Sequence, residues 1–284
     1  MRYDSLFAMS HSPSSIGAGF PGSADLPANF SVDVVIPVLN EAHVLRKNVE
    51  TLLYFLQANL DYRWQVVIVD NGPTDGTQNV ARELTAAHSR SYSPTCDSVD
   101  AAGRSYAWLQ SRADLVCYMD VDLSTKLDHL QALLDAIAFE GYDVSIGSRL
   151  MRNSRTTRSF KREVISRIYN VMVKAVLSTR FSDAQCGFKA VSRRAVEAIV
   201  PHIEDQSWFF DTELLVLAEK QGYRIKDIPV IWIEDDDSRV KIMKTGWEDI
   251  KGVWRLRRLL WSGRLSPAAA KEDEERRRVS APQS

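Results

Sequence analysis

The stretch SVDVVIPVLNE, residues 31–41, has the form of a buried strand that ends in polar residues. Its Val and Ile residues form an apolar run, and Pro37 and Asn40 end it because proline lacks the N–H that a sheet ladder needs. From Glu41 to Leu60 the apolar residues recur at helical spacing instead, at Val44, Leu45, Val49, Leu52, Leu53 and Leu56. The stretch therefore predicts a strand followed at once by an amphipathic helix.

The same alternation continues along the chain. We expect further strands at 64–69, 114–119 and 143–146, and further helices at 78–87, 101–112 and 127–139. Strands that alternate with helices form a mostly parallel sheet with helices on both faces. The sequence therefore predicts a Rossmann-like α/β fold.

Composition narrows the function classes. The 284 residues carry 36 basic and 37 acidic side chains, a net charge of −1, which argues against a nucleic-acid partner because such domains are usually basic. Three widely spaced cysteines (Cys96, Cys117 and Cys186) fit neither a disulfide framework nor a zinc site, so we expect a reducing, cytoplasmic setting. No apolar run is long enough to span a membrane.

Composition also indicates the domain limits. Residues 1–29 are rich in Ser, Pro and Gly, and residues 265–284 are highly charged, so we expect both segments to be disordered. The main folded domain is expected to span 30–245, followed by a basic amphipathic helix at 246–264.

Polar side chains follow three of the expected strands: Asn40 and Glu41, then Asp70 and Asn71, then Asp120 and Asp122. In parallel sheets, ligands bind beyond the carboxyl ends of the strands, so these residues indicate one site. The alternative is that they serve only as helix caps and turn formers.

Asp120 and Asp122 directly follow an apolar strand, two residues apart. Such a pair can bind a hard divalent cation, and magnesium usually takes only one or two protein carboxylates together with phosphate oxygens. The five histidines form no motif, which argues against a zinc site.

Six motifs in order resemble the family-2 inverting glycosyltransferases, and in particular the dolichyl- or polyprenyl-phosphate glucose and mannose synthase branch. They are VVIPVLNE (34–41), VDNGPTDGT (69–77), DVDLST (120–125), GSR (147–149), QCGFK (185–189) and FDTELL (210–215). The resemblance implies a GT-A fold and transfer of a single hexose, with inversion, from a nucleotide-diphosphate sugar to a polyprenyl phosphate. It also implies Mg²⁺ or Mn²⁺ as cofactor.

By the same resemblance, the donor-binding residues would be Pro37, Leu39, Glu41, Asp70, Arg104, Asp120 and Val121. Asp122 would be the metal ligand and, with Asp120 and Asp211, a catalytic residue. Asp211 could instead be the N-cap of a helix spanning 212–220. The donor is left open between the UDP-glucose and GDP-mannose types.

Positive charge is expected to hold the acceptor. A lipid phosphate is already anionic, so it needs cations to hold it more than it needs a general base. The expected phosphate and acceptor contacts are Arg149, Lys189, Arg239 and Lys241. Arginine suits phosphate because its guanidinium binds two oxygens at once.

Two basic segments indicate a membrane surface as a further partner. Residues 149–180 carry nine basic side chains and one acid, and residues 251–264 carry a charge of +5 close to Trp247, Trp254 and Trp261. Basic amphipathic helices bind membrane surfaces reversibly, which predicts a peripheral enzyme on the cytoplasmic face, with a separate membrane protein as a candidate partner. The alternatives are that both helices pack on the core, and that the acceptor is a soluble or polysaccharide hydroxyl.

Overall fold

The computed structural model describes residues 30–72, 74–88, 92–94, 103–233 and 242–262. In these residues a seven-stranded sheet runs in the order β3-β2-β1-β4-β7-β5-β8. Its strands are β1 (Ser31–Val38), β2 (Arg63–Asp70), β3 (Tyr92–Pro94), β4 (Leu115–Met119), β5 (Val144–Ser148), β7 (Phe188–Ser192) and β8 (Ile225–Pro229). Most neighbours are parallel, and the predicted α/β architecture is confirmed.

One strand runs against the others. β7 lies between β4 and β5 and is antiparallel to both, with Met119 paired to Phe188. Because β7 starts where β4 ends, the loop that precedes β7 lies beside the carboxyl end of β4. The sequence pattern did not predict this strand.

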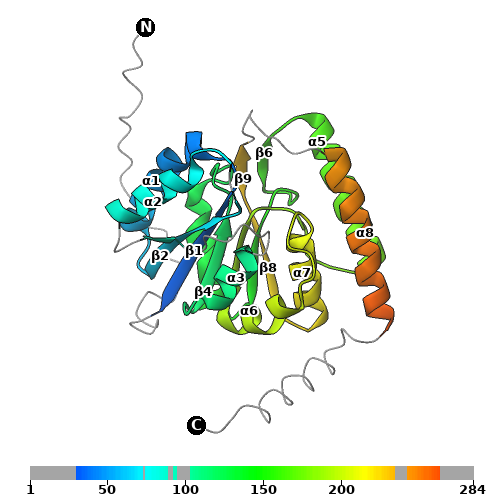
Figure 1. Ribbon diagram of the computed structural model, residues 1–284. Helices are drawn as coiled ribbons and strands as arrows, with labels where there is room; N and C mark the ends of the chain where they lie inside the picture. The colour runs from blue at the N-terminus through cyan, green and yellow to red at the C-terminus, as the bar shows by residue number, and fades with distance from the viewer. Residues whose placement is uncertain (1–29, 73, 89–91, 95–102, 234–241, 263–284) are drawn as a thin grey trace.

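Helices cover both faces of the sheet (Figure 1). One apolar cluster lies under α1 (Ala42–Asn59), α2 (Thr77–Ala87) and α4 (Leu130–Ala138), which follows the short 3₁₀ turn η2 (Leu127–His129). The other lies under α3 (Gly103–Gln110), α6 (Arg193–Ile199), the 3₁₀ turn η3 (Val200–His202) and α7 (Phe210–Lys220). The two clusters bury the apolar faces that the helical spacing predicts.

A smaller sheet and two long helices complete the molecule. β6 (Arg155–Thr157) pairs in parallel with β9 (Ile231–Ile233). The helices α5 (Phe160–Leu177) and α8 (Ile242–Trp261) lie side by side (Figure 1) and pack their inner sides into the second cluster. In the described part of the chain, no helix is both long enough and apolar enough to cross a membrane.

Each of these two helices carries apolar residues on two sides. The inner side of α5 buries Tyr169, Val173 and Leu177, and the inner side of α8 buries Val253 and Leu256. The outer sides expose a second set of large apolar residues: Phe160, Val164, Ile168, Val171, Trp247, Trp254 and Trp261. Helical spacing alone did not separate the two sets.

Burial in the first cluster predicts where α1 is sensitive to mutation. Leu56→Ala removes a fully buried side chain, so it should lower the free energy of unfolding by about 2–5 kcal/mol. Tyr54→Ala, on the exposed side of the same helix, should change it by no more than about 0.5 kcal/mol. Urea unfolding of both variants measures the difference, and equal losses would contradict the assigned helix face.

Candidate functional site

The three polar strand ends meet at one edge of the sheet, as expected. Asn40 follows β1 with a left-handed backbone (φ 59°), and its Oδ1 accepts a hydrogen bond from Thr74 N at 2.7 Å. Glu41 N donates to Thr77 Oγ1 at 2.8 Å, and Asn71 N donates to Val38 O at 3.1 Å. These bonds join the loops after β1 and β2 into one rigid rim.

Four of the expected donor-binding residues, Pro37, Leu39, Glu41 and Asp70, lie at this rim. Leu39 is exposed, and Pro37 and Glu41 are half-buried. Asp70 is buried at the end of β2 and accepts a hydrogen bond from Gly72 N at 2.8 Å. Val121 is buried, and its carbonyl accepts from Asn48 Nδ2 at 3.0 Å. The side chain of Arg104 lies outside the described residues.

The turn after β4 presents two carboxylates in fixed orientations. Leu123 N donates to Asp120 O at 3.2 Å, and Leu123 adopts a left-handed backbone (φ 52°) that is unfavourable for a branched residue. The Asp122 carboxylate accepts hydrogen bonds from Ser124 N at 2.9 Å and Ser124 Oγ at 2.7 Å. Tyr118 Oη donates to Asp120 Oδ1 at 3.2 Å.

The QCGFK segment lies directly against this turn. Asp120 N donates to Gly187 O at 3.2 Å, and a Cβ atom at Gly187 would lie only 2.0 Å from Asp120 Oδ2. Lys189 is fully buried, and its ammonium group donates to Cys186 O and lies 3.0 Å from Asp211 Oδ1. Glycine at 187 is therefore a steric requirement of the Asp120 position.

Asp211 lies within the first turn of α7 rather than capping it. The helix begins at Phe210 and its N-cap is Phe209, so the alternative of Asp211 as N-cap is wrong. An acidic side chain in the first turn is favoured by the helix dipole. The helix directs Asp211 toward Lys189, and thereby toward the turn that follows β4.

Negative charge exceeds positive charge at this edge. The pKa of Asp120 is raised to about 7, mainly because surrounding protein displaces water, and then by the negative charges of Asp122 and Asp211. Lys189 acts in the opposite direction. A divalent cation would relieve this repulsion, so the carboxylates of Asp120 and Asp122 fit one chemically. Among the described residues, no group of three His, Cys, Asp or Glu side chains is arranged to hold a metal ion.

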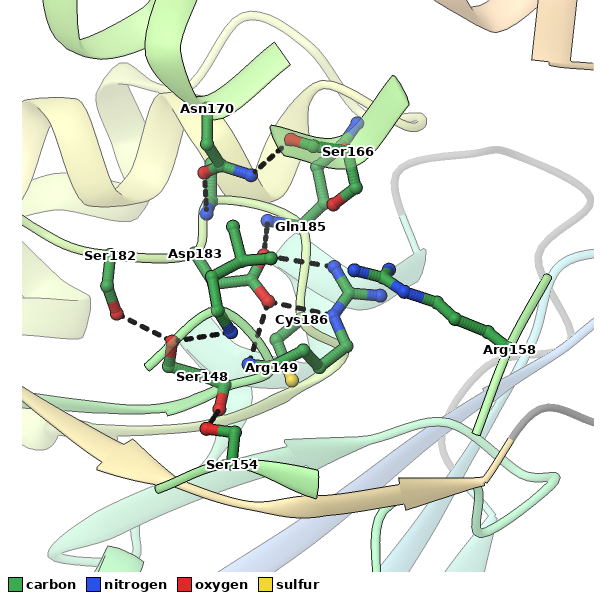
Figure 2. A network of polar contacts seen from close by, with 12 residues as sticks. Ser148, Arg149, Ser154, Arg158, Ser166, Asn170, Ser182, Asp183, Gln185 and Cys186 are labelled. Carbon is green, nitrogen blue, oxygen red and sulfur yellow. Dashed lines mark hydrogen bonds and ion pairs between the residues drawn. The ribbon is translucent and has the colours of Figure 1, made fainter. Parts of the chain in front are cut away.

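Arg149 is fixed by a buried ion pair (Figure 2). Its Nε and Nη2 donate to the two oxygens of Asp183 at 2.7 and 2.9 Å, and its backbone N donates to Asp183 Oδ2 at 3.1 Å. The guanidinium carbon lies 5.6 Å from the centre of the Trp232 ring. Burial alone would raise the pKa of Asp183, yet Arg149 holds it below its usual range.

Sequence reasoning missed the residues that hold this arginine. Asp183 lies two positions before the QCGFK motif, and this proximity could have marked it as a site residue. No sequence pattern marked Trp232. Trp232 lies in β9, which is joined to the turn after β4 by a bond from Ile233 N to Ser124 O at 2.8 Å. The predicted contacts Arg239 and Lys241 lie outside the described residues.

The Arg149–Asp183 pair yields a stability prediction. Asp183→Asn leaves a buried guanidinium without its counter-charge, so it should lower the free energy of unfolding by about 3–5 kcal/mol. Glu197→Gln, which breaks the exposed pair with Arg193, should cost less than about 1 kcal/mol. Thermal and urea unfolding compare the two variants, and a wild-type stability of Asp183→Asn would show that the pair is not formed.

Comparisons with known proteins show which family the sequence matches. The model of "Glycosyl transferase family 2" matches residues 33–200. The glycosyltransferase AglD of Haloferax volcanii is 36% identical over 82% of this chain, although the chain spans only 39% of that protein. The dolichyl-phosphate beta-glucosyltransferase of Drosophila melanogaster is 27% identical over 89% of this chain and 82% of its own length.

A solved structure supports the fold in the same way. Glucosyl-3-phosphoglycerate synthase of Mycobacterium tuberculosis, in complex with Mn²⁺, UDP-glucose and phosphoglyceric acid, aligns with a TM-score of 0.59 at 14% identity. The alignment covers 81% of this chain and 80% of that one. The family model covers more than half of the chain, and the protein described here is a member of glycosyl transferase family 2.

Proposed function

We propose that this glycosyltransferase moves one hexose from a nucleoside-diphosphate sugar to a polyprenyl phosphate, with inversion at the anomeric carbon. The observation that carries the proposal is the carboxylate-rich edge at Asp120 and Asp122 beside the buried cations Arg149 and Lys189. The Drosophila relative is a dolichyl-phosphate beta-glucosyltransferase, which supports the acceptor class. The same relative favours glucose over mannose as the transferred sugar, and UDP-glucose over GDP-mannose as the donor.

The rim between β1 and β2 would bind the nucleoside. Its exposed Leu39 and half-buried Pro37 offer apolar contact to a base, and Glu41 and Asp70 offer acceptors to base or ribose hydroxyls. Arg104 is proposed to contact the donor phosphates. Asp120 would contact the ribose or sugar beside Val121, and Asp122 would hold Mg²⁺ or Mn²⁺. The bound cation would neutralise charge on the departing diphosphate.

The acceptor side would rely on positive charge. A lipid phosphate is anionic at neutral pH and can attack the anomeric carbon without losing a proton. Arg149 is held in one orientation by Asp183, so its position does not have to be organised during the reaction. Lys189 is fully buried and would act through Asp211, which it pairs with. Arg239 and Lys241 remain proposed phosphate contacts.

The outer sides of α5 and α8 would bind a membrane surface. They expose large apolar side chains, including Phe160, Ile168 and three tryptophans, beside basic residues such as Lys251 and Arg257. Tryptophan favours the membrane interface, and each basic residue near an anionic surface adds about 1 kcal/mol. We place the enzyme at the cytoplasmic face of a membrane as a peripheral protein, with a membrane protein as a further candidate partner.

The metal assignment is tested at Asp122. Asp122→Asn should weaken UDP binding in the presence of Mn²⁺ at least about tenfold, because a neutral amide is a much poorer ligand for a divalent cation. Asp128→Asn, an exposed aspartate shortly after the same turn, should bind UDP as the wild type does. Calorimetric titration with UDP and Mn²⁺ measures both, and unchanged affinity in Asp122→Asn would refute the assignment.

The membrane assignment is tested with vesicles of phosphatidylcholine and phosphatidylglycerol. The wild type should sediment with them at about 50 mM salt and be released at about 0.5 M salt, because salt screens the attraction between charges. Combined Trp247→Ser, Trp254→Ser and Trp261→Ser should abolish sedimentation, whereas Tyr54→Ser, on the exposed side of α1, should not. A wild-type protein that stays in the supernatant at low salt would instead direct the search toward soluble hydroxyl acceptors.

A further inference from the structure

The inner side of α8 buries a carboxylate, Asp249, beside the site. Asp249 is 4% exposed, and its Oδ2 accepts one hydrogen bond, from Gln185 Nε2 at 3.1 Å. Its Oδ1 has no hydrogen-bond partner among the described residues. A buried carboxylate with so few partners costs free energy. An apolar residue at this position would avoid that cost, so stability alone does not explain the carboxylate. We therefore look for its role in the site.

The partner of Asp249 belongs to the loop that holds Arg149. Gln185 N donates to Asp183 Oδ1 at 3.2 Å, and both oxygens of Asp183 bind the Arg149 guanidinium. Figure 2 shows Gln185, Asp183 and Arg149 in this chain of contacts. Gln185 therefore links α8, through its side chain, to Asp183, through its backbone N–H, and so to the arginine of the site.

The same loop also forms hydrogen bonds with two other polar groups of the site. The residues after Gln185 are Cys186, whose carbonyl accepts from the Lys189 ammonium, and Gly187, whose carbonyl accepts from Asp120 N. Holding the Gln185 side chain therefore restrains the backbone that these two carbonyls belong to.

Helix α8 is itself placed firmly enough to act as the anchor. Its Gly252 lies against Phe209, where a Cβ atom would come within 2.5 Å of the ring. Its Arg255 donates to both oxygens of Glu213 at 2.9 and 2.7 Å, and Glu213 lies in α7 two residues after Asp211. These contacts fix Asp249 relative to α7 and to the loop.

We propose that Asp249 is a positioning residue for the transfer reaction: by orienting Gln185 it holds Asp183, and through Asp183 the guanidinium of Arg149, in the geometry that binds phosphate. The proposal rests on the proposed function for the role of Arg149 as a phosphate contact. In this role Asp249 would act through these contacts and not by touching a substrate.

The first test compares steady-state kinetics. Asp249→Ala should lower kcat/KM for a polyprenyl phosphate by about tenfold or more, because small misplacements in a site are costly, while UDP affinity stays within about twofold. Asp249→Asn keeps an oxygen for Gln185 Nε2 and should retain most activity. Glu248→Ala, an exposed neighbour on α8, is the matched control and should behave as the wild type.

A double-mutant cycle shows whether Asp249 acts through Arg149. In an Arg149→Ala background, Asp249→Ala should cost less than about twofold, since the group that it positions is already absent. Gln185→Ala removes the same hydrogen bond from a half-buried position. It replaces Asp249→Ala in the cycle if that variant does not fold. Additive losses, a parallel loss of UDP affinity, or wild-type kinetics in both single variants would overturn the proposal.

A spectroscopic measurement separates this inference from the proposed function. The Nε–H of Arg149, which donates to Asp183 in the wild type, should give a slowly exchanging NMR signal, assigned with Arg149→Lys. Its hydrogen exchange should accelerate at least about tenfold in Asp249→Ala and in Gln185→Ala, and not in Glu248→Ala. Unchanged exchange overturns the positioning role even if the enzyme is active. A wild type that transfers no hexose would overturn the proposed function instead.

Discussion

The close approach of the Gly187 backbone to the Asp120 carboxylate is the contact on which the site depends. A methyl group at 187 would lie 2.0 Å from Asp120 Oδ2, so any side chain at this position would force the Asp120 carboxylate to move. The contact exists because β7 is antiparallel to β4, with Met119 opposite Phe188. This single reversal in a mostly parallel sheet brings the loop before β7 to the carboxyl end of β4, where parallel sheets bind ligands.

Each cation of the site has an internal counter-charge. Arg149 is paired with Asp183, and Lys189 with Asp211, and each pair is almost wholly buried. Burying such pairs contributes little to stability, because desolvation offsets most of the attraction between the charges. Its advantage for a transferase is that the polar groups are already oriented before a charged substrate arrives. The excess negative charge at Asp120 and Asp122 would be balanced by a divalent cation.

The sequence predicted well what depends on local pattern. The boundaries of β1, β2, β4 and the helices between them follow from apolar spacing, and Asp120 and Asp122 were placed because they directly follow an apolar strand. The direction of β7 was not predictable, since pairing between distant segments leaves no local periodicity. The same holds for the contacts from Asp183 to Arg149 and from Asp249 to Gln185. On α5 the apolar spacing revealed a helix, but not which of its two apolar sides packs on the core.

The most direct measurement of the central claim is the transfer reaction itself. Purified protein is incubated with Mn²⁺, UDP-glucose labelled in the sugar, and a polyprenyl phosphate, and the label is followed into the organic phase. The account predicts a glucosyl polyprenyl phosphate whose anomeric proton shows the β configuration, inverted from the α-linked donor. Label that stays in the aqueous phase while the protein binds UDP, or a product with retained configuration, would contradict it.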